Sequence, residues 1–271
     1  MSQADIDARN RQFWDELCGT QLAQTLNITP GSTQAIETFD HAYFNMYPYL
    51  TDCVPAGGFG GKKVLEIGLG YGTLGQHLCG HAEQYRGLDI AQGPVDMMNV
   101  RIERLGLSSA HFWAVRGSML DCPFEDGEFD VVVSIGCFHH TGNLNRCIEQ
   151  AYRVLKPGGI AYFMVYNKFS YRNWLKWPRA TWEAALHGTT TGRSHDERAS
   201  YDANLRGEAA PETVFSSISE LRQMCANFSS FRAVKRNCGV SHLKLNGALR
   251  RLALPVIGPL LGLDVYVTAK K

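Results

Sequence analysis

Short apolar runs alternate with segments of helical spacing along the middle of the chain. The run over 129–135, FDVVVSI, is the clearest, because an almost unbroken Val and Ile sequence is typical of a parallel strand covered on both faces. The same reasoning predicts strands over 62–68, 85–90, 110–115, 160–166, 230–236 and 264–269. Helical spacing predicts helices over 71–80, 92–105, 144–155 and 217–228. This alternation predicts an α/β fold with a doubly wound, mostly parallel seven-stranded sheet.

A glycine-rich turn, Gly68-Leu69-Gly70-Tyr71-Gly72, follows the first predicted strand. Alternate glycines let the backbone turn sharply and approach a ligand closely, and the next helix presents free N–H groups there. Asp89 ends the second predicted strand, about 20 residues on, where a ribose-binding carboxylate is found in nucleotide-cofactor sites. Because Gly70-x-Gly72-x-x-Gly75 also matches the dinucleotide fingerprint, a nicotinamide cofactor is an alternative.

Composition narrows the class of protein. The 271 residues are 45% hydrophobic and 20% charged, which is typical of a folded globular protein. Since 27 basic residues nearly balance 26 acidic ones, we expect no nucleic-acid partner. The longest apolar stretch, 252–263, contains Pro255 and Pro259 and is shorter than the ~20 residues of a spanning helix, so we expect no membrane span.

The eight cysteines bear on the compartment. None stands in a C-x-x-C pair, so neither a zinc ribbon nor a thioredoxin motif is indicated, and we expect no metal site. The first ten residues show no basic region followed by an apolar run, so no export signal is indicated. We therefore expect reduced thiols and a cytoplasmic location.

The stretch 62–167 resembles the class I S-adenosylmethionine-dependent methyltransferases, in the branch that modifies small molecules such as quinones and natural products. The matching pieces are VLEIGLGYG (64–72), GLDI (87–90), CPFEDGEFDVVVS (122–134), CFHHTGN (137–143) and RVLKPGG (153–159). Five ordered motifs are more specific than one glycine pattern. The resemblance implies a Rossmann-like methyltransferase fold.

The resemblance also implies which residues hold S-adenosylmethionine. The glycine turn and the acid before it would contact the methionine end, Asp89 would take both ribose hydroxyls, and the residues after the third strand would lie by the adenine. The expected cofactor-binding residues are Glu66, Gly68, Gly70, Gly72, Asp89, Ile90, Ser118, Met119, Ser134 and Tyr43.

Ser118 departs from the family pattern. Many relatives carry an acid at this position, and that acid accepts a hydrogen bond from the adenine amino group. A serine hydroxyl can accept the same bond without a charge. Asp121 could substitute through a loop shift, although its interpretation as a turn or cap residue is favoured.

His139 and His140 are the candidate catalytic residues. Methyl transfer is an in-line displacement, for which the protein mainly aligns the reactants and excludes water. A base is needed only where the acceptor must lose a proton, and imidazole suits that role near neutral pH. Both histidines follow the fourth strand, at the carboxyl edge where α/β sheets bind ligands. The alternative is that one of them bonds a backbone carbonyl or caps a helix.

The remaining segments are expected to select the substrate. We predict an N-terminal helical lid over 1–61 and a methyltransferase domain over 62–271, with a cap insertion at about 168–215 and a late insertion at about 238–262. The aromatic cluster over 39–49 is either a helix that packs on the sheet or a lid over the cofactor, with Tyr43 or Tyr47 at the cofactor carboxylate or beside the substrate. The aromatic cluster after the fifth strand favours a planar, apolar or cationic acceptor, or else forms a small core of the cap. The expected substrate-binding residues are Tyr47, Tyr166, Asn167 and Tyr171.

The apolar segment 243–263 has an open role. It follows the pattern of a surface-seeking amphipathic helix, or of an apolar helix packed on the cap or on a second subunit. The second reading leaves a homodimer as an alternative.

Taken together, the motifs predict an enzyme that transfers a methyl group from S-adenosylmethionine to oxygen or nitrogen of a small apolar or aromatic acceptor and releases S-adenosylhomocysteine. Two other functions stay open. One is a cofactor-binding sensor or scaffold without turnover, and the other is an NAD-dependent oxidoreductase.

Overall fold

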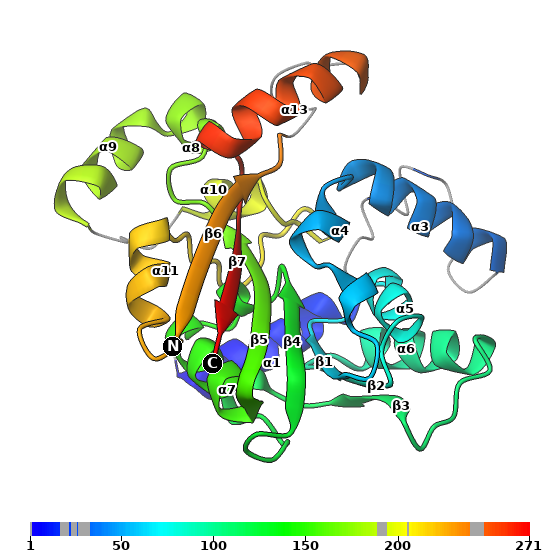
Figure 1. Ribbon diagram of the computed structural model, residues 1–271. Helices are drawn as coiled ribbons and strands as arrows, with labels where there is room; N and C mark the ends of the chain where they lie inside the picture. Colours follow the sequence, from blue (N-terminus) through cyan, green and yellow to red (C-terminus); the bar gives the residue numbers. More distant parts are fainter. Residues whose placement is uncertain are drawn as a thin grey trace.

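Seven strands form one sheet in the order β3-β2-β1-β4-β5-β7-β6 (Figure 1). The computed structural model describes residues 2–16, 22, 26, 33–188, 194–204, 206–238 and 247–271. The strands are β1 (Lys63–Ile67), β2 (Gln84–Asp89), β3 (Phe112–Arg116), β4 (Phe129–Ile135), β5 (Leu155–Tyr166), β6 (Ser230–Arg236) and β7 (Asp264–Lys270). The first five pair in parallel, whereas β7 is antiparallel to both β5 and β6. The predicted doubly wound, mostly parallel seven-stranded sheet is confirmed.

Helices cover both faces of this sheet. On one face α5 (Thr73–Cys79) and α6 (Gln92–Arg104) share a hydrophobic cluster with Val131 and Val133 of β4, and on the other α7 (Leu144–Val154) and α11 (Ile218–Met224) share one with Val132. Alternate side chains of a strand point to opposite faces, so this central strand is apolar at almost every position. That double coverage is the physical basis of the FDVVVSI pattern.

The element bounds differ from the sequence expectation mainly at β5. We predicted a strand over 160–166, but β5 begins at Leu155 and pairs with Phe129 before a register shift at the bend over 157–159. The chain passes from α7 into β5 without a loop. The Pro-Gly-Gly sequence therefore forms an irregularity within the strand rather than a connection to it.

The described part of the segment before β1 contains helices. It contains α1 (Gln3–Trp14), α3 (Thr33–Met46), α4 (Leu50–Cys53) and the short 3-10 helix η1 (Ala56–Gly58). Asn10 of α1 donates from Nδ2 to the carbonyl of His140 (2.8 Å), and Asp15 accepts from the N–H of Gly93 at the start of α6 (2.8 Å). These contacts place α1 against the carboxyl edge of the parallel strands.

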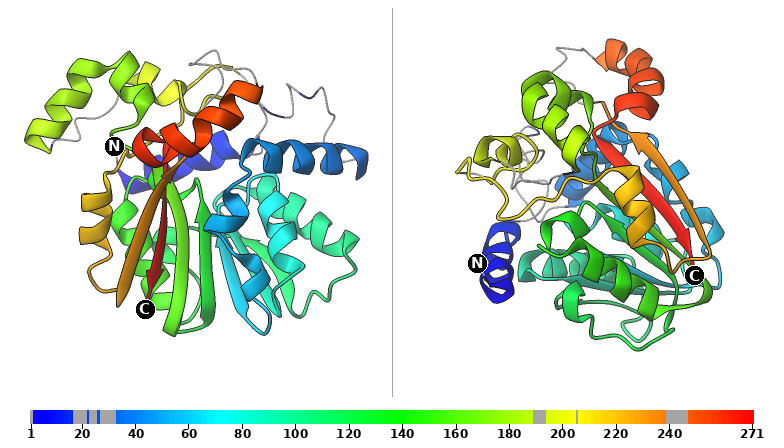
Figure 2. Two further views of the ribbon diagram at one scale, coloured as in Figure 1. Left: turned by 45° about the horizontal axis from the view of Figure 1, so that its top comes forward. Right: turned by 90° about the vertical axis from the view of Figure 1, so that its left-hand side faces the viewer.

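The cap and late insertions stand at the same edge. The cap contains α8 (Tyr171–Lys176), α9 (Pro178–His187) and α10 (His195–Ala199), and the late insertion contains α13 (Gly247–Leu261). Helices α8, α9 and α13 lie at the top of the molecule in Figure 1 and again in Figure 2, at the end opposite the C-terminus. Part of both expected insertions, including 239–246, lies outside the described residues. No helix in the described ranges is long and apolar enough to cross a bilayer.

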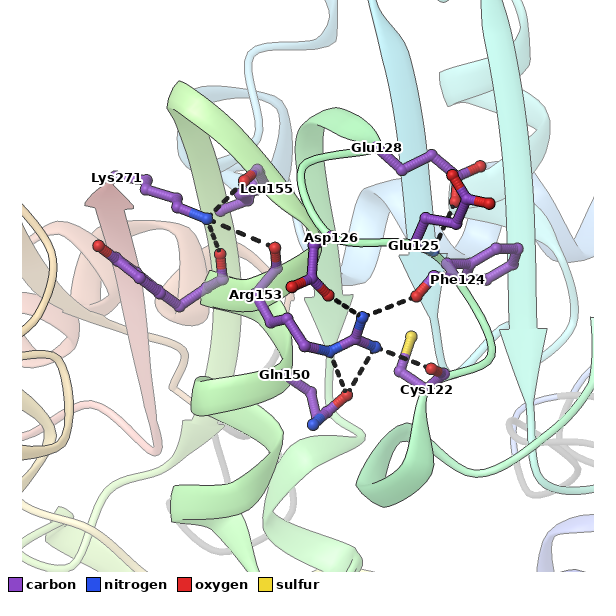
Figure 3. A network of polar contacts seen from close by, with 10 residues as sticks. Cys122, Phe124, Glu125, Asp126, Glu128, Gln150, Arg153, Leu155 and Lys271 are labelled. Atoms are coloured by element: carbon purple, nitrogen blue, oxygen red, sulfur yellow. Dashed lines mark hydrogen bonds and ion pairs between the residues drawn. The ribbon is translucent and has the colours of Figure 1, made fainter.

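Two basic side chains bind backbone carbonyls around the C-terminal end of α7: Arg153 joins α7 to the segment before β4, and Lys271 joins the residue after β7 to α7 (Figure 3). Arg153 donates from Nη1 to the carbonyl of Phe124 (2.8 Å) and from Nη2 to that of Cys122 (2.8 Å). Lys271 donates from Nζ to the carbonyls of Tyr152 and Leu155 (both 2.7 Å), which are acceptors at the C-terminal end of α7.

Candidate active site

Two cavities meet at the carboxyl edge of the parallel strands. The narrower, of about 70 Å³, is lined from β2, α1 and the loop after β3, and the wider, of about 450 Å³, from α3, β5, β7 and the cap. Both have the backbone of Gly68 and Gly70 on one side and Ile135 and Gly136 on another. The glycine turn after β1 and the end of β4 therefore form the boundary between the two.

The glycine turn is required by close packing as much as by backbone conformation. Gly68 has a φ of +80°, and a Cβ placed there would lie 2.3 Å from the Cβ of Cys137, which follows β4. Gly72 has a φ of +76° and lies against Arg101 of α6, outside both cavities. Gly68 and Gly70 thus face the cavities, whereas Gly72 serves the contact between α5 and α6.

Glu66 is a buried acid at the wall of the wider cavity. Its Oε2 atom accepts a hydrogen bond from the hydroxyl of Tyr85. Burial raises the pKa of Glu66 to about 8, although the Tyr85 hydrogen bond and Arg101 oppose the increase. A cationic group in the cavity would favour the ionised form of this acid, as expected for a residue near the ammonium or sulfonium of S-adenosylmethionine.

Asp89 ends β2 at the wall of the narrower cavity. Its Oδ2 atom accepts from the N–H of Leu69 (2.8 Å) and its Oδ1 atom from that of Ala91 (2.9 Å). Burial raises the pKa of Asp89 to about 6, and these backbone hydrogen bonds oppose the rise. Each oxygen retains acceptor capacity, so two neighbouring hydroxyl groups could bind it. Ile90, Ser118 and Met119 line the same cavity, as expected for an adenosine site.

Of the two serines expected at the cofactor, Ser118 caps a short helix and Ser134 has no hydrogen-bond partner among the described residues. Ser118 precedes the 3-10 helix η2 (Met119–Asp121), and its Oγ atom accepts from the N–H of Leu120 (3.2 Å) while the residue lines the narrower cavity. Asp121 is an exposed member of that helix and lines neither cavity. Ser134 is fully buried in β4, with no partner for its Oγ among the described residues, and Gly136 lines the cavities instead.

His140 lies where the two cavities approach each other. It belongs to the 3-10 helix η3 (Phe138–His140), and its Nδ1 atom is 2.8 Å from the carbonyl oxygen of Glu212. Because a carbonyl only accepts, Nδ1 carries the proton in this geometry and Nε2 is the basic nitrogen. Nε2 lies 3.4 Å from Oδ2 of Asp202, and the hydroxyl of Tyr166 donates to the same oxygen (2.8 Å). His140 lines the narrower cavity, while Tyr166 and Asp202 line the wider one.

His139 is not brought to either cavity. It is fully buried, and its ring centroid lies 4.1 Å from that of His140 and 4.2 Å from that of Tyr166. Burial, with repulsion from His140, holds the pKa of His139 well below its usual value. The neutral ring packs in the core, and its backbone carbonyl accepts from the N–H of Val214 (2.8 Å). Of the two candidate bases, the geometry leaves His140.

The wider cavity is aromatic and acidic. Tyr43, Tyr47 and Tyr166 line it, as the sequence led us to expect. The other aromatic lining residues are Phe13, Trp14, Phe39, Tyr71, Tyr201 and Tyr266. Among the described lining residues there is no Lys, Arg or His, and the carboxylates are those of Glu16, Glu66 and Asp202.

Two expected substrate-binding residues contact the late insertion and its borders. Asn167 is buried and donates from Nδ2 to the carbonyl of Gly262 (2.7 Å), so it joins the end of β5 to the end of α13. Tyr171 is buried with Cys238 and Leu263 beneath α13. Neither lines the cavities. Both are close to Tyr166 in sequence, but the chain turns away from the site directly after β5.

Several site residues gave little signal in the sequence. Asp202 lies in a polar, charged part of the predicted cap insertion, and only the adjacent Tyr201 marks it as different. Asn10 and Trp14 belong to α1, whose mean hydropathy is low and whose apolar positions are few. Long-range contacts, rather than local pattern, place these residues at the site.

Residues 65–163 match the methyltransferase domain family. A phthiotriol/phenolphthiotriol dimycocerosates methyltransferase of Mycobacterium tuberculosis is 31% identical over 158 residues, which are 58% of this chain and 53% of that protein. The chain thus spans about half the length of this curated relative.

Solved structures share the fold at lower identity. A SAM-dependent methyltransferase of Thermotoga maritima superposes with a TM-score of 0.55 at 18% identity, over 85% of this chain and 94% of that one. The [4+2]-cyclase SpnF gives a TM-score of 0.58 at 17% identity, over 96% of this chain and 94% of that one. These similarities show the fold, which hosts more than one reaction.

Proposed function

We propose that this protein, whose residues 65–163 match the methyltransferase domain family, transfers a methyl group from S-adenosylmethionine to oxygen or nitrogen of a small acceptor. The acceptor has an apolar or aromatic body. The observation that carries the proposal is the pair of joined cavities, one with Asp89 on its wall and the other with Glu66 and a ring of aromatic side chains. The match to a named methyltransferase over 158 residues supports the same reaction.

The residues present fit the cofactor. Asp89 would accept from both ribose hydroxyls, with Ile90 and Met119 beside the adenine in the narrower cavity. Glu66 is a buried acid without a cation among the described lining residues of its cavity, and a positive cofactor would compensate its ionised form. S-Adenosylmethionine supplies a methyl group already activated by its sulfonium. The chain has to align the acceptor with that methyl and exclude water.

The chain offers a route for the proton that a hydroxyl or ammonium acceptor must lose. Asp202 lines the wider cavity and holds the hydroxyl of Tyr166, so its carboxylate can take the proton from an acceptor bound there. The neighbouring Nε2 atom of His140, basic because Nδ1 donates to Glu212, can then hold that proton. The aromatic walls would position an apolar body and exclude water from the reacting atoms.

The dinucleotide fingerprint has a structural explanation. Gly72 packs on Arg101, and a Cβ at Gly75 would lie 2.6 Å from both the Glu66 carboxylate and the Tyr85 hydroxyl. Neither glycine lines a cavity. The second and third glycines of Gly70-x-Gly72-x-x-Gly75 therefore allow helix packing, and they do not favour a nicotinamide cofactor over S-adenosylmethionine.

A cytoplasmic location remains part of the proposal, because eight cysteines without a C-x-x-C pair suit a reducing compartment.

Binding and turnover measured separately test the proposal. Calorimetry with S-adenosylmethionine, S-adenosylhomocysteine and NADH should show binding of the first two alone. Incubation with a panel of phenols, alcohols and amines of aromatic and aliphatic type should then release S-adenosylhomocysteine. Binding of NADH alone would contradict the cofactor assignment, whereas S-adenosylmethionine binding without turnover on any acceptor would favour a sensor or scaffold.

Asp202→Asn and His140→Ala test the proton route. Each should lower kcat by about 100-fold, because general base assistance contributes that much, while the affinity for S-adenosylhomocysteine changes little. Glu208→Gln, an exposed change in the same cap segment, is the matched control. Unchanged turnover in both variants would contradict the proposed proton route without contradicting methyl transfer.

A further inference from the structure

The exposed apolar side chains of this protein are concentrated on three helices. Within the described ranges, every large hydrophobic residue with more than half of its surface exposed belongs to α8, α9 or α13. These are Leu175 (65%), Trp182 (59%), Leu186 (63%), Leu252 (73%), Val256 (60%) and Leu260 (64%). We call these six residues the apical surface. A group of this kind on one part of a protein marks a site of interaction.

Helix α13 is apolar on two sides. Its inner side carries Ala253, Leu254 and Ile257, which pack on the cluster formed by Tyr171, Cys238 and Leu263. Its outer side repeats at helical spacing and carries Leu252, Val256 and Leu260, together with the exposed Pro255 and Pro259. Packing inside the chain therefore accounts for one side of α13 and leaves the other uncovered.

Helix α13 is held firmly enough to present that outer side. Arg250 is buried and donates from Nη2 to the carbonyl of Met46 (2.6 Å) and from Nε to that of Cys238 (2.8 Å). A Cβ at Gly262 would lie 2.2 Å from the carbonyl oxygen of Arg236, so the helix end lies directly against β6. The outer side is thus a fixed feature of the fold.

The cap helices lie at the same end of the molecule as α13 (Figures 1 and 2), and their sequences carry aromatic and basic residues. Trp174 and Trp177 are half-buried, and Trp182 is exposed. Lys176 is exposed, and Arg179 is 94% exposed, with its Nε atom 3.5 Å from Oε1 of Glu183. Tryptophan and basic residues beside exposed Leu are typical of helices that lie in the interface of a bilayer.

The charge along the chain distinguishes two candidate partners of the apical surface, a second copy of the protein and a lipid bilayer. From Ser229 to Leu263 the sequence has six Lys and Arg residues and no Asp or Glu, and of these six Arg250 is buried and Lys244 lies outside the described residues. An isologous dimer through this end would bring two such basic segments together, whereas an anionic lipid surface would attract them. We propose that the apical surface binds peripherally to an anionic lipid bilayer, with Leu252, Val256, Leu260 and Trp182 entering the acyl boundary.

This attachment would place the cap toward the lipid. The segment that follows α9 and α10 contributes Tyr201, Asp202 and Asn204 to the wider cavity. An apolar acceptor dissolved in the membrane would then lie on the same side of the protein as that cavity. Attachment itself does not depend on methyl transfer, so it can be tested without an acceptor.

Flotation of the full chain with lipid vesicles tests the proposal. Vesicles of phosphatidylcholine with one-third phosphatidylglycerol should carry the protein to the top of the gradient, and vesicles of phosphatidylcholine alone should carry much less. High salt should release it, because screening weakens the attraction of the basic segment. The triple variant Leu252→Ser, Val256→Ser, Leu260→Ser should lower the apparent lipid affinity by about tenfold or more.

A matched variant controls for loss of any exposed apolar side chain. Val100→Ser with Leu105→Ser changes two exposed residues near α6, and its lipid affinity should equal that of the wild type. Circular dichroism melting confirms that both variants are folded. Absence of flotation with the anionic vesicles, or equal loss in both variants, would overturn the proposal. So would light scattering that shows a dimer in the wild type and a monomer in the α13 triple variant, because the surface would then bind a second copy.

Discussion

Asp89 and Glu66 show how burial prepares single residues for a charged ligand. Both acids are almost inaccessible, both have a raised pKa, and each lies on the wall of a different cavity. Burial disfavours a negative charge, while hydrogen bonds from Leu69, Ala91 and Tyr85 keep the carboxyl groups fixed in place. A ligand that brings hydroxyl donors to one and a positive group to the other would gain from both.

Asp89→Ala tests the ribose contact. Loss of two hydrogen bonds to a charged group should weaken S-adenosylhomocysteine binding by about 100-fold, as measured by calorimetry. Asp96→Ala, an exposed change in α6, serves as the control and should bind normally. Retention of wild-type affinity by the Asp89 variant would show that the narrower cavity does not hold the ribose.

Glu66 also makes stability depend on pH. Its pKa is about 8 in the folded chain, against 4.5 for the ordinary group, so between these values the folded state holds a proton that the unfolded state has lost. The contribution of Glu66 to the free energy of unfolding should therefore fall as the pH rises from about 5 to 8. Glu66→Gln should make the fall of the unfolding free energy over this pH range shallower in urea unfolding without ligand, while the part that comes from Asp89 stays. An equal slope in variant and wild type would contradict the assignment.

The site residues divide by how local their signals are. The glycine turn, Asp89 and His140 lie at the ends of strands or within a few residues of them. The strand pattern alone therefore puts them at one edge of the sheet. Asp202 and Asn10 reach that edge only through the folding of the cap and of α1, for which spacing along the chain gives no guide. His139 and His140 are adjacent in sequence and alike in chemistry, so only the three-dimensional path of η3 separates the buried ring from the one at the cavities.

Helix α3 is joined to the sheet domain by one buried cation. Arg101 of α6 is completely buried and donates from Nη1 and Nη2 to the two carboxylate oxygens of Asp40 (2.8 and 2.9 Å). The same carboxylate accepts from the hydroxyl of Thr73 at the start of α5 (2.6 Å). Three helices thus meet at Asp40, and α3 brings Tyr43 and Tyr47 with it to the wider cavity.

Asp40→Ala should destabilise the protein strongly. Removal of the carboxylate leaves the Arg101 charge buried without its partner, and breaking a buried pair in this way costs about 3 kcal/mol of unfolding free energy. Glu37→Ala changes an exposed acid on the same helix and should cost little. Urea denaturation measures both. Equal stability of the two variants would show that α3 is not held through this pair.

Elements differ in how well the sequence predicts them. The core strands agree within two residues, because each is an apolar run between turns, whereas the start of β5 was wrong by five residues. Leu155 and Lys156 continue from α7 into the sheet, and their helical spacing with Leu144 and Ile148 concealed the change of conformation. For α13 the apolar pattern was clear but symmetric, so it could not indicate which side would face the chain.

The whole molecule consists of one sheet domain and of the N-terminal, cap and late segments, which together are nearly as long as that domain. These segments meet at one edge of the sheet. The last strand, β7, lies between β5 and β6 and closes the sheet in antiparallel sense. Lys271, just beyond it, reaches the last carbonyls of α7 (Figure 3). The last residue thereby stabilises the end of a helix that lies more than 100 residues before it in the sequence.

Lys271→Met tests this closure. The substitution keeps the aliphatic stem and removes the ammonium donor, so it should lower the unfolding free energy by about 1–2 kcal/mol. Lys270→Met, at the exposed neighbouring position, should leave stability within about 0.5 kcal/mol of the wild type. Thermal melting followed by circular dichroism measures both. The reverse order of the two variants would refute the role of Lys271.

The hydrogen bond from the His140 ring to Glu212 gives the imidazole a second property. Glu212 belongs to the cap segment, so the ring is held in one tautomer only while that segment lies against the core. If the segment lifts, Nδ1 loses its acceptor, and the two tautomers become free to exchange in water. The nitrogen resonances of this ring would then report the fraction of time that the cap segment closes the wider cavity. No label on the cap would be needed.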